Sequence, residues 1–441
     1  MMKRVALHTL GCKLNYAETS AIGERFKANG FDLIDFGEDS DVVLINSCTV
    51  TENANKECRQ LVRRALRKNP SACVIVTGCY AQLKPEEIAS IEGVDYVLGS
   101  AEKFRLFDLV DQFAKREVPR VSVGEIAHET GFGPAYSSEA DARTRAFLKV
   151  QDGCDYNCSF CTIPLARGSS RSQPLDDVVA QAKELVGRGY LEIVLTGVNT
   201  GDYGKKDGTD LYELLCRLHE VEGLRRLRIS SIEPNLLTDQ IIELAASSDR
   251  MMPHFHVPLQ SGSDKILGKM RRRYRSSDYR DRVEKILHEM PDAGIGVDVI
   301  VGFPGEGEDE FQQTYQFLHA LPVSYFHVFT YSERENTPAN EFEGSVPVAE
   351  RRERTRMLRT LSEKKRGSFA RKFEGSIRPV LFEAERGDGT VQGYSDNYVR
   401  VALTPEQRVA EQIVEVQIGE WSGDFAEGEV VEATQLTDVS E

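Results

Sequence analysis

Three cysteines within eight residues are the side chains of this chain best suited to chemistry. Cys154, Cys158 and Cys161 follow the spacing C-x3-C-x2-C, just after Gly153 and the apolar run 146–150. Three thiolates on one loop can bind three irons of a [4Fe–4S] cluster and leave the fourth iron without a protein ligand. Such an open iron can bind a small molecule and transfer an electron to it. The spacing therefore predicts a cluster with a chemical role.

Other uses of three neighbouring cysteines fit this loop less well. A structural zinc site takes four ligands, and no histidine or fourth cysteine lies close to the loop in the sequence. A disulfide would use two of the thiols and leave the third over. The three-ligand cluster is therefore the preferred interpretation.

A second set of cysteines is dispersed along the first 80 residues. Cys12, Cys48 and Cys79 each follow a short apolar run of strand type. The carboxyl ends of parallel strands meet at one edge of a sheet, where ligands bind, so topology would bring these thiols together. A single such cysteine would be interpreted as a small buried residue of a turn. Three at equivalent positions favour a second three-cysteine cluster, again with one open iron.

The other three cysteines have no such placement. Cys58, Cys73 and Cys216 lie inside helix or strand patterns, and we expect them to be core or surface thiols without a ligand role.

Composition limits the class of protein. The chain has 441 residues, a formal net charge of −15 and nine cysteines, and its pI of 5.2 does not by itself indicate a nucleic-acid binder. The N-terminus lacks the pattern of a signal peptide, and no apolar run reaches membrane-spanning length. Free cysteines are typical of a reducing compartment, so we predict a cytoplasmic protein with no membrane partner.

The N-terminal part alternates between strand and helix patterns. Strands are predicted near 5–10, 42–46 and 73–77, with helices near 16–29, 52–68 and 85–91. This alternation predicts an open parallel α/β domain over residues 1–125. A stretch rich in Gly, Ser and Ala follows, which we interpret as a linker over 126–143.

A second alternation begins at Thr144 and is predicted to form a domain over 144–368. Its six strand–helix units are typical of a partial (β/α)6 barrel, in which chemistry lies at the carboxyl ends of the strands. The six strands are expected at 144–150, 191–196, 225–230, 254–258, 295–301 and 325–330. The helices between them include 176–187, 211–219, 278–290 and 308–320.

A long helix over 348–372 leads into the last predicted domain, 369–441. Short β-rich runs near 377–383, 391–394, 398–402 and 413–416 predict a small all-β barrel of oligonucleotide-binding type. The fold class is therefore α/β with a small all-β domain at the C-terminus.

The motifs resemble a known family along nearly the whole chain. LGCKLNYAET, INSCTVT and TGCYAQ, around the three dispersed cysteines, look like the N-terminal domain of the methylthiotransferases. AFLKVQDGCDYNCSFCTIPLARG resembles the radical S-adenosylmethionine (SAM) core, whose signature has an aromatic residue, here Phe160, before the last cysteine. The tail resembles the TRAM domain, a small RNA-binding barrel. GCKLN, the SSIEP of 230–234 and QDGCDYNC look like the branch that modifies threonylcarbamoyladenosine in tRNA.

The resemblance implies a mechanism with two [4Fe–4S] clusters and SAM. The cluster on Cys154, Cys158 and Cys161 would bind and reduce SAM, and the resulting 5′-deoxyadenosyl radical would remove hydrogen from C2 of adenine. The cluster on the dispersed cysteines would carry the sulfur that is methylated and transferred. A reductase of flavodoxin or ferredoxin type and a sulfur donor are implied as partners.

The resemblance and the strand ends together suggest residues of a SAM pocket. Polar residues at the ends of barrel strands are candidates for cofactor contacts. They are Phe160 on the cysteine loop and Thr196, Gly197, Glu233, Gln260 and Asp298 at or near strand ends. Glycines can also serve tight turns only, Asp298 can be a core carboxylate, and Glu233 can face the substrate instead of SAM.

Basic segments suggest where RNA would bind. Residues 351–372 hold ten Lys or Arg and two Glu, a net charge of +8 in an acidic protein. Smaller basic clusters lie at 269–273 and 63–68, although charged helices are often simply solvated. Tyr394, Tyr398 and Trp421 could stack on unpaired bases or belong to the core. A tRNA anticodon loop suits such a surface, because specific RNA readers favour bases splayed out of loops.

Two other functions stay open at this point. One keeps the chemistry and changes the target to isopentenyladenosine of tRNA or to an aspartate of a ribosomal protein. The other is a non-catalytic RNA-binding protein with a structural metal.

Overall fold

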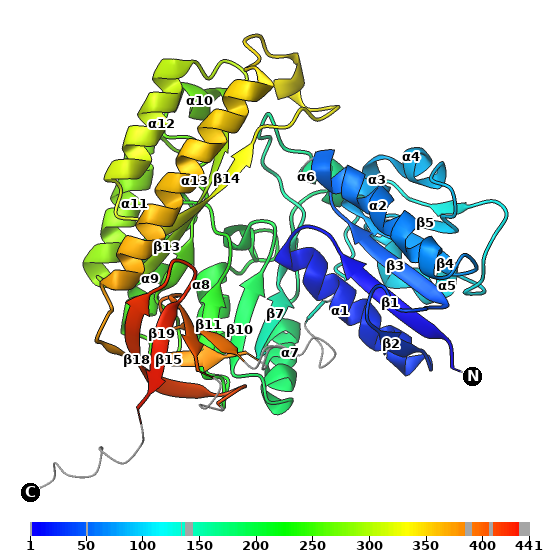
Figure 1. The fold of residues 1–441 in the computed structure, drawn as a ribbon, viewed down its shortest axis with the longest axis horizontal. Helices are drawn as coiled ribbons and strands as arrows, with labels where there is room; N and C mark the ends of the chain where they lie inside the picture. The colour runs from blue at the N-terminus through cyan, green and yellow to red at the C-terminus, as the bar shows by residue number, and fades with distance from the viewer. Residues whose placement is uncertain are drawn as a thin grey trace, which may run out of the picture.

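The computed structural model describes residues 2–49, 52–133, 135–136, 144–383, 390–404 and 409–431. Three parts follow one another along the chain in Figure 1: a sheet with helices, a half barrel with outer helices, and a small β-barrel. None of the helices in these ranges is both long and apolar enough to cross a membrane.

The N-terminal part is built on a six-stranded parallel sheet in the order β2-β1-β3-β4-β5-β6. Its central strands β3 and β4 are buried along their whole length, as expected when helices cover both faces of a parallel sheet. The strands are β1 Arg4–Thr9, β2 Asp32–Ile34, β3 Val42–Ser47, β4 Cys73–Gly78, β5 Tyr96–Leu98 and β6 Arg120–Ser122. The three predicted strands are confirmed, and the three short ones were missed.

Helices connect these strands on both sides of the sheet. They are α1 Lys13–Ala28, α2 Glu52–Lys68, α3 Cys79–Leu83, α4 Pro85–Ala89 and α5 Leu106–Leu109, with the 3-10 turn η1 Glu102–Arg105. The long helices α1 and α2 correspond to the predicted stretches near 16–29 and 52–68, and the short α4 corresponds to the one near 85–91.

The central part forms half a barrel of parallel strands. Two three-stranded sheets, β11-β10-β7 and β12-β13-β14, are joined by bridges from Leu227 to Met251 and from Ser231 to His256. The strands are β7 Arg145–Lys149, β10 Glu192–Thr196, β11 Arg226–Ile229, β12 His254–His256, β13 Gly294–Val301 and β14 Tyr325–Thr330. The predicted partial (β/α)6 barrel is confirmed, and its strands agree with the predicted ones to within one or two residues.

Helices cover the outside of the half barrel, and a large apolar core fills the space between them and the strands. Asp210 and Thr238 cap α8 and α9 through side-chain bonds to backbone N–H groups, a normal way to begin a helix. The helices are α6 Ile163–Arg167, α7 Leu175–Gly187, α8 Leu211–His219, α9 Asp239–Ser247, α10 Asp264–Lys269, α11 Ser276–Glu289 and α12 Glu308–Ala320. Two short strands, β8 Gln151–Asp152 and β9 Arg171–Ser172, pair antiparallel to each other, and the cysteine loop lies between them in the chain.

The described residues of the predicted linker pack against the rest of the protein. Ile126 of the 3-10 turn η2 Ile126–His128 is buried, and Ala135 accepts a hydrogen bond from the Lys149 N–H. Residue 134 and residues 137–143 of the linker lie outside the described residues.

The long helix α13, Val348–Arg371, runs along the half barrel and leads into a closed five-stranded barrel. Its strands are β15 Ile377–Phe382, β16 Val391–Ser395, β17 Arg400–Leu403, β18 Ile413–Trp421 and β19 Ala426–Val430. The predicted C-terminal barrel is confirmed, with β19 as an additional strand. Arg226 and Arg228 of β11 donate to its backbone carbonyls, so the barrel is held on the ends of the half-barrel strands.

Candidate functional site

The cysteine loop follows β8 and offers three sulfurs with polar donors around them. The backbone N–H of Tyr156 lies 3.4 Å from Cys154 Sγ, and that of Ile163 lies 3.4 Å from Cys161 Sγ. The guanidinium of Arg272 donates to Cys158 Sγ over 3.2 Å. Hydrogen bonds to ligand sulfurs are a common feature of iron–sulfur sites, because they stabilise the charge of the thiolates.

The protonation of the loop thiols also fits a metal-ligand role. Burial raises the pKa of Cys154 and Cys161 to about 12 and raises that of Cys158. Free thiols with such pKa values are poor nucleophiles, and a bound metal would displace their protons. The free thiols are therefore unsuited to covalent catalysis by cysteine.

The structure brings the three dispersed cysteines to one wall of a cavity, as the topology predicts. Cys12 precedes α1, Cys48 follows β3, and Cys79 begins α3. A Cβ atom on Gly11, whose φ is +95°, would lie only 2.6 Å from Cys48 Sγ. Glycine is therefore required where the first strand end passes the second cysteine.

A buried ion network lies beside the dispersed cysteines and joins the two α/β parts. Glu18 of α1 pairs with Lys103 of η1 on its own side, and with Lys149 and Arg167 of the central part at 3.0 Å. Asp152 accepts from Arg167 at 2.9 Å and pairs with Lys149 at 2.7 Å. All five side chains are buried, so each charge depends on its partners.

The charges of this network shift the pKa of Cys79 and the pKa of Glu18. Burial raises the pKa of Cys79, and the positive charges of Arg167 and Lys103 oppose that rise. Burial would also raise the pKa of Glu18, but Arg167, Lys103 and Lys149 hold it well below its usual range. Glu18 is therefore an ionised group inside the protein.

The cavity between the three parts has a volume of about 720 Å³. The dispersed cysteines lie on one wall, barrel strand ends on another, and α13 with the C-terminal barrel on the third. Three of the predicted SAM contacts, Thr196, Gly197 and Asp298, line it. The Thr196 hydroxyl is buried without a hydrogen-bond partner among the described residues, which is the state expected of a group that awaits a ligand.

The other predicted SAM contacts, Phe160, Glu233 and Gln260, do not line this cavity. Glu233 pairs with Arg272, the residue that also donates to Cys158. Phe160 packs edge-on against Phe303 in a small apolar cluster. Gln260 has a positive φ of 70°, and its backbone N–H donates to Asp298 O over 2.8 Å.

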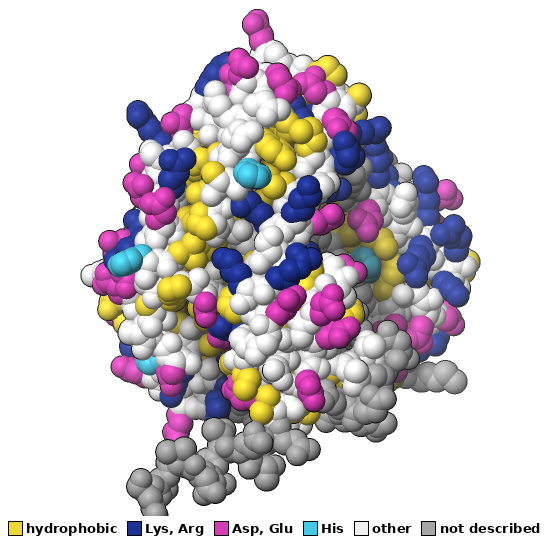
Figure 2. Space-filling view, turned by 60° about the vertical axis from the view of Figure 1, so that its left-hand side comes forward, with side chains coloured by type: hydrophobic (Ala, Val, Ile, Leu, Met, Phe, Trp, Pro, Cys, Tyr) yellow, Lys and Arg dark blue, Asp and Glu magenta, His cyan; other side chains and the backbone are white. Residues whose placement is uncertain are grey.

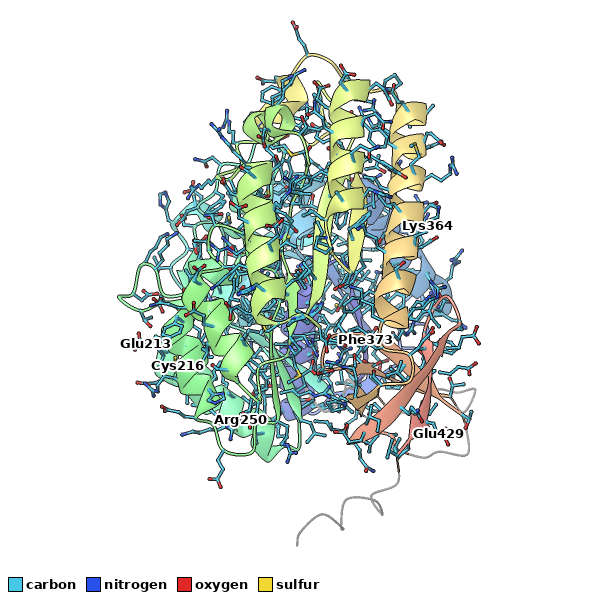
Figure 3. The ribbon with its side chains drawn as sticks, turned by 90° about the vertical axis from the view of Figure 1, so that its left-hand side faces the viewer. Glu213, Cys216, Arg250, Lys364, Phe373 and Glu429 are labelled. Atoms are coloured by element: carbon cyan, nitrogen blue, oxygen red, sulfur yellow. The ribbon has the colours of Figure 1, made fainter. Side chains whose placement is uncertain are left out.

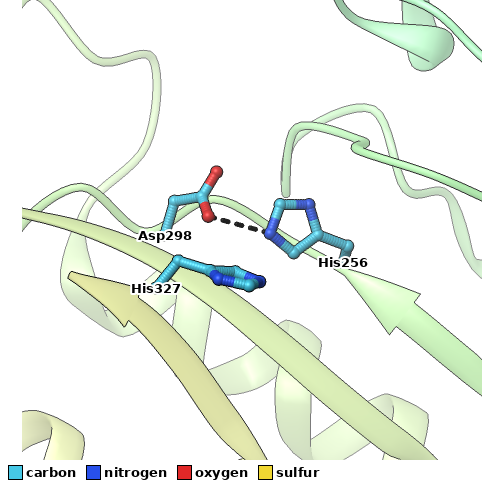
Figure 4. A group of neighbouring side chains, drawn as sticks. All are labelled: His256, Asp298 and His327. Carbon is cyan, nitrogen blue, oxygen red and sulfur yellow. Dashed lines mark hydrogen bonds and ion pairs between the residues drawn. The ribbon is translucent and has the colours of Figure 1, made fainter. Parts of the chain in front are cut away.

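Two histidines flank Asp298, His256 at the end of β12 and His327 in the middle of β14. His256 Nε2 lies 2.9 Å from Asp298 Oδ1, and His327 lies beside both residues, as Figure 4 shows. One ligand atom from each of the three lies within 4.8 Å of the others. Burial lowers the pKa of His327, while the negative charge of Asp298 raises it.

The aromatic residues of the tail form a stack against the half barrel. The rings of Tyr394 and Tyr398 are 4.6 Å apart, and Tyr398 stacks on His254 at 4.1 Å. His254 in turn shares a hydrogen bond of 2.9 Å with Tyr325. Trp421 belongs to the core of the C-terminal barrel, although one edge reaches the cavity. The structure therefore places these rings at the cavity, largely engaged with one another.

The basic segment 351–372 does not form one uniform surface. Arg351 and Arg354 are buried and pair with Glu333 and Glu306, so the expectation that the whole segment faces RNA is wrong for them. Lys364 is exposed and points outward from α13 in Figure 3. On the face of the molecule that Figure 2 shows, Lys and Arg side chains are interspersed with Asp and Glu side chains.

The cluster at 269–273 is also divided. Arg272 is 4 % exposed and serves the cysteine loop, and Arg273 lies 3.8 Å above the ring of Tyr156. Arg63, Arg64, Arg67 and Lys68 are exposed on α2, as expected of a solvated helix face.

The remaining cysteines agree with the core or surface interpretation. Cys58 and Cys73 are fully buried in apolar clusters, and burial raises the pKa of each to about 12. Cys216 is half-buried on α8 (Figure 3).

Several residues of the site were not predicted from the sequence. They are Glu18, Lys103, Lys149, Asp152, Arg167, Arg272, His256 and His327. His256 carries a signal that could have been used, since it lies within the predicted strand 254–258 as the chosen Asp298 lies within 295–301. The charged residues had no such signal, because their partners are distant in sequence.

Two family models match this chain. "Uncharacterized protein family UPF0004" matches residues 4–99, and "Radical SAM superfamily" matches residues 148–318. The Threonylcarbamoyladenosine tRNA methylthiotransferase MtaB of Bacillus subtilis is 41% identical over 445 residues, covering 98% of this chain and 98% of that protein. The chain belongs to the radical SAM methylthiotransferase family. It is therefore an enzyme, a transferase that uses SAM and [4Fe–4S] clusters.

Other relatives extend the comparison. The Aquifex aeolicus protein with the MtaB name is 40% identical, with 87% of this chain and 94% of that protein covered. The tRNA-2-methylthio-N(6)-dimethylallyladenosine synthase of the same organism is 30% identical and covers 98% of this chain and 99% of its own. Among solved structures, the radical SAM methyltransferase TsrM from Kitasatospora setae has a TM-score of 0.54 at 16% identity, covering 77% of each chain. That similarity shows the fold alone.

Proposed function

We propose that this enzyme adds a methylthio group to C2 of threonylcarbamoyladenosine beside the anticodon of tRNA. The observation that carries the proposal is the shared cavity: the dispersed cysteines and the ends of the half-barrel strands border one chamber. A reaction that both activates a C–H bond and delivers sulfur needs its two centres to reach the same base.

In this proposal the cysteines are the ligands of two [4Fe–4S] clusters. Cys154, Cys158 and Cys161 would hold one cluster, and the other would be held by the dispersed residues Cys12, Cys48 and Cys79. When bound, these clusters and SAM supply a one-electron reductant, a hydrogen-abstracting radical and a sulfur source. The side chains of the protein would orient SAM and the base for the reaction.

We assign SAM to the region between the cysteine loop and the strand ends. The unpaired Thr196 hydroxyl and the neighbouring Gly197 would contact it, with Asp298 as a further candidate. A Cβ on Gly197 would lie 2.9 Å from Gln151 Oε1, so this strand end has no room for a side chain. Phe160 on the cysteine loop, Glu233 beside Arg272, and Gln260 after β12 are the further candidates for SAM contacts.

The tRNA substrate is supported by the relatives and by the tail. The relatives at 41% and 40% identity carry the threonylcarbamoyladenosine name, and the dimethylallyladenosine synthase is more distant at 30%. The closed C-terminal barrel and the exposed cations of α13 would hold the RNA, with the target base extruded into the cavity. A flavodoxin- or ferredoxin-type reductase would supply electrons in the cytoplasm.

The test is the modified nucleoside itself. The gene is expressed in a host that makes threonylcarbamoyladenosine but lacks its methylthio derivative, and tRNA nucleosides are measured by mass spectrometry. We expect the methylthio derivative to appear with the wild type and to be absent with the Cys154→Ala variant. If the threonylcarbamoyl nucleoside stays unmodified while methylthio appears on dimethylallyladenosine, the proposed target is refuted.

A further inference from the structure

Five positively charged side chains line the cavity, and they differ in whether they have a hydrogen-bond or ion-pair partner. Arg167 pairs with Glu18 and Asp152, Arg228 with Glu192, and Arg400 donates to Gln392. The two others, Lys13 and Arg366, make no hydrogen bond or ion pair with any described residue. Two cations are therefore free to bind a ligand inside the chamber.

Both free cations line the same cavity, and they come from different parts of the chain. Lys13 follows Cys12 in the first turn of α1, and Arg366 extends from α13. The Arg366 guanidinium lies 5.4 Å from the ring centre of Tyr325. The pKa of His327, already lowered by burial, is lowered further by the positive charges of both Arg366 and Lys13, against the opposing effect of Asp298.

Aromatic side chains that contact one another line the cavity beside Arg366. Tyr325 is hydrogen-bonded to His254, which is stacked under Tyr398. Two like charges that line one cavity repel each other, and an anion bound by both would offset that repulsion. The site therefore favours a ligand with one compact negative charge.

The position of Lys13 indicates which anion this is. Lys13 is covalently adjacent to Cys12, and both residues are exposed and line the cavity, so Lys13 lies next to a cysteine that would hold the sulfur-carrying cluster. Backbone phosphates would stay outside when a base is extruded. A threonylcarbamoyl substituent brings its own carboxylate in with the base, whereas a dimethylallyl substituent brings none.

We propose that Lys13 and Arg366 bind the carboxylate of the threonylcarbamoyl group and so select this adenosine over uncharged modifications. The inference rests on the proposed function, because it presupposes that this nucleoside enters the cavity. Lys13 and Arg366 act here as specificity residues, and the ureido and ribose parts of the nucleoside are left to other contacts.

The experiment compares two RNAs that differ by one charge. One is an anticodon stem-loop with threonylcarbamoyladenosine, and the other carries the same nucleoside with its carboxyl group as a methyl ester. Dissociation constants are measured at fixed salt with the iron-loaded wild type and with Lys13→Met, Arg366→Met and the double variant. We expect the wild type to prefer the acid RNA about tenfold, the size of a charge-assisted hydrogen bond, and the double variant to show nearly no preference.

Lys364→Met is the matched control. Lys364 lies two residues from Arg366 on the same helix and is exposed as Arg366 is, but it does not line the cavity (Figure 3). It should weaken the binding of both RNAs equally and leave the acid-to-ester ratio unchanged, as expected for a phosphate contact. Circular dichroism spectra of all variants should match that of the wild type.

The outcomes test the carboxylate site and the proposed function separately. A wild type with equal affinity for the two RNAs, or a double variant that keeps the wild-type ratio, overturns the carboxylate site. Equal losses on both RNAs in Lys13→Met and Arg366→Met also overturn it, because they indicate phosphate contacts. A methylthio product on the acid RNA, assayed in parallel, tests the proposed function separately: product without charge preference refutes only this inference.

Discussion

The two cysteine trios reach similar sets of ligands by opposite routes. Cys154, Cys158 and Cys161 lie on one loop, where backbone N–H groups of the same loop approach two of the sulfurs. Cys12, Cys48 and Cys79 come from three strand ends and meet only when the parallel sheet has formed. A loop site depends on local conformation, whereas a dispersed site depends on the whole sheet and on what packs against it.

Their surroundings differ in the same way. The loop trio needs one distant residue, Arg272, at one sulfur. The dispersed trio has Gly11 beside Cys48 and a buried ion network between the two α/β parts beside Cys79. Damage to long-range packing should therefore impair the dispersed site first.

The largest effects are expected from removing each trio in turn. The Cys154→Ala, Cys158→Ala, Cys161→Ala variant should abolish SAM cleavage, because SAM would then have no iron to bind. The Cys12→Ala, Cys48→Ala, Cys79→Ala variant should retain SAM cleavage and lose the methylthio product. Anaerobic iron analysis should fall from about eight to about four irons per chain in either variant.

The control for both triples is Cys216→Ala, which should keep all the iron. A dispersed triple variant that retains its full iron content would contradict the second cluster.

The interface network should be the next most sensitive feature. Arg167→Met leaves Glu18 and Asp152 buried with fewer partners, and breaking such a buried pair costs about 3–5 kcal/mol. We expect a marked fall in the thermal midpoint, together with loss of about half the iron. Arg188→Met is the control, because its pair with Glu184 is partly exposed and should contribute less than about 1 kcal/mol.

Acid should also weaken this interface. The pKa of Glu18 in the folded protein is held well below its unfolded value of about 4.3, so its ion pairs stabilise the fold above that pH. Their contribution is lost as pH falls below it. The thermal midpoint of the wild type should therefore decrease from pH 5 to pH 3 more steeply than that of Glu18→Gln, whose contribution is already absent. Parallel pH profiles would show that Glu18 is not responsible.

Two glycine substitutions test the close approach of Gly11 to Cys48 at the dispersed site. Gly11→Ala places a Cβ against Cys48 Sγ, whereas Gly30→Ala has a similarly positive φ of +79° but meets nothing within 4 Å. Both should lose about 1–2 kcal/mol of stability through backbone strain. Only Gly11→Ala should also lose iron, and equal iron in the two variants would contradict the role of this contact.

The smallest effect should come from the loop site. Arg272→Met removes the hydrogen bond to Cys158 and should lower the reduction potential of the loop cluster, because donors to ligand sulfurs favour the reduced state. SAM cleavage should slow several-fold, with the iron content maintained. Arg272→Lys should restore part of the potential, and Arg273→Met should leave it unchanged. A redox titration followed by electron paramagnetic resonance measures all three.

Regular elements were well predicted wherever their patterns were long. The predicted helices over 211–219 and 308–320 have the observed bounds, since apolar periodicity and capping residues act locally. The strands β2, β5 and β6 were missed because three residues carry too little pattern, and neighbouring strands induce them. The basic segment 351–372 was only partly interpreted, because net charge does not reveal which arginines have buried partners.

The sequence by itself determined the ligand types, the spacing of the loop trio and the succession of strands that brings the dispersed trio to one edge. These follow from local pattern and from the fixed direction of parallel connections. Tertiary structure alone decided that Arg167 meets Glu18, that Arg272 meets Cys158, and that Lys13 and Arg366 have no hydrogen-bond or ion-pair partner among the described residues. Such pairings join residues far apart in the chain, and their strength comes from the exclusion of water, which exists only after packing is complete.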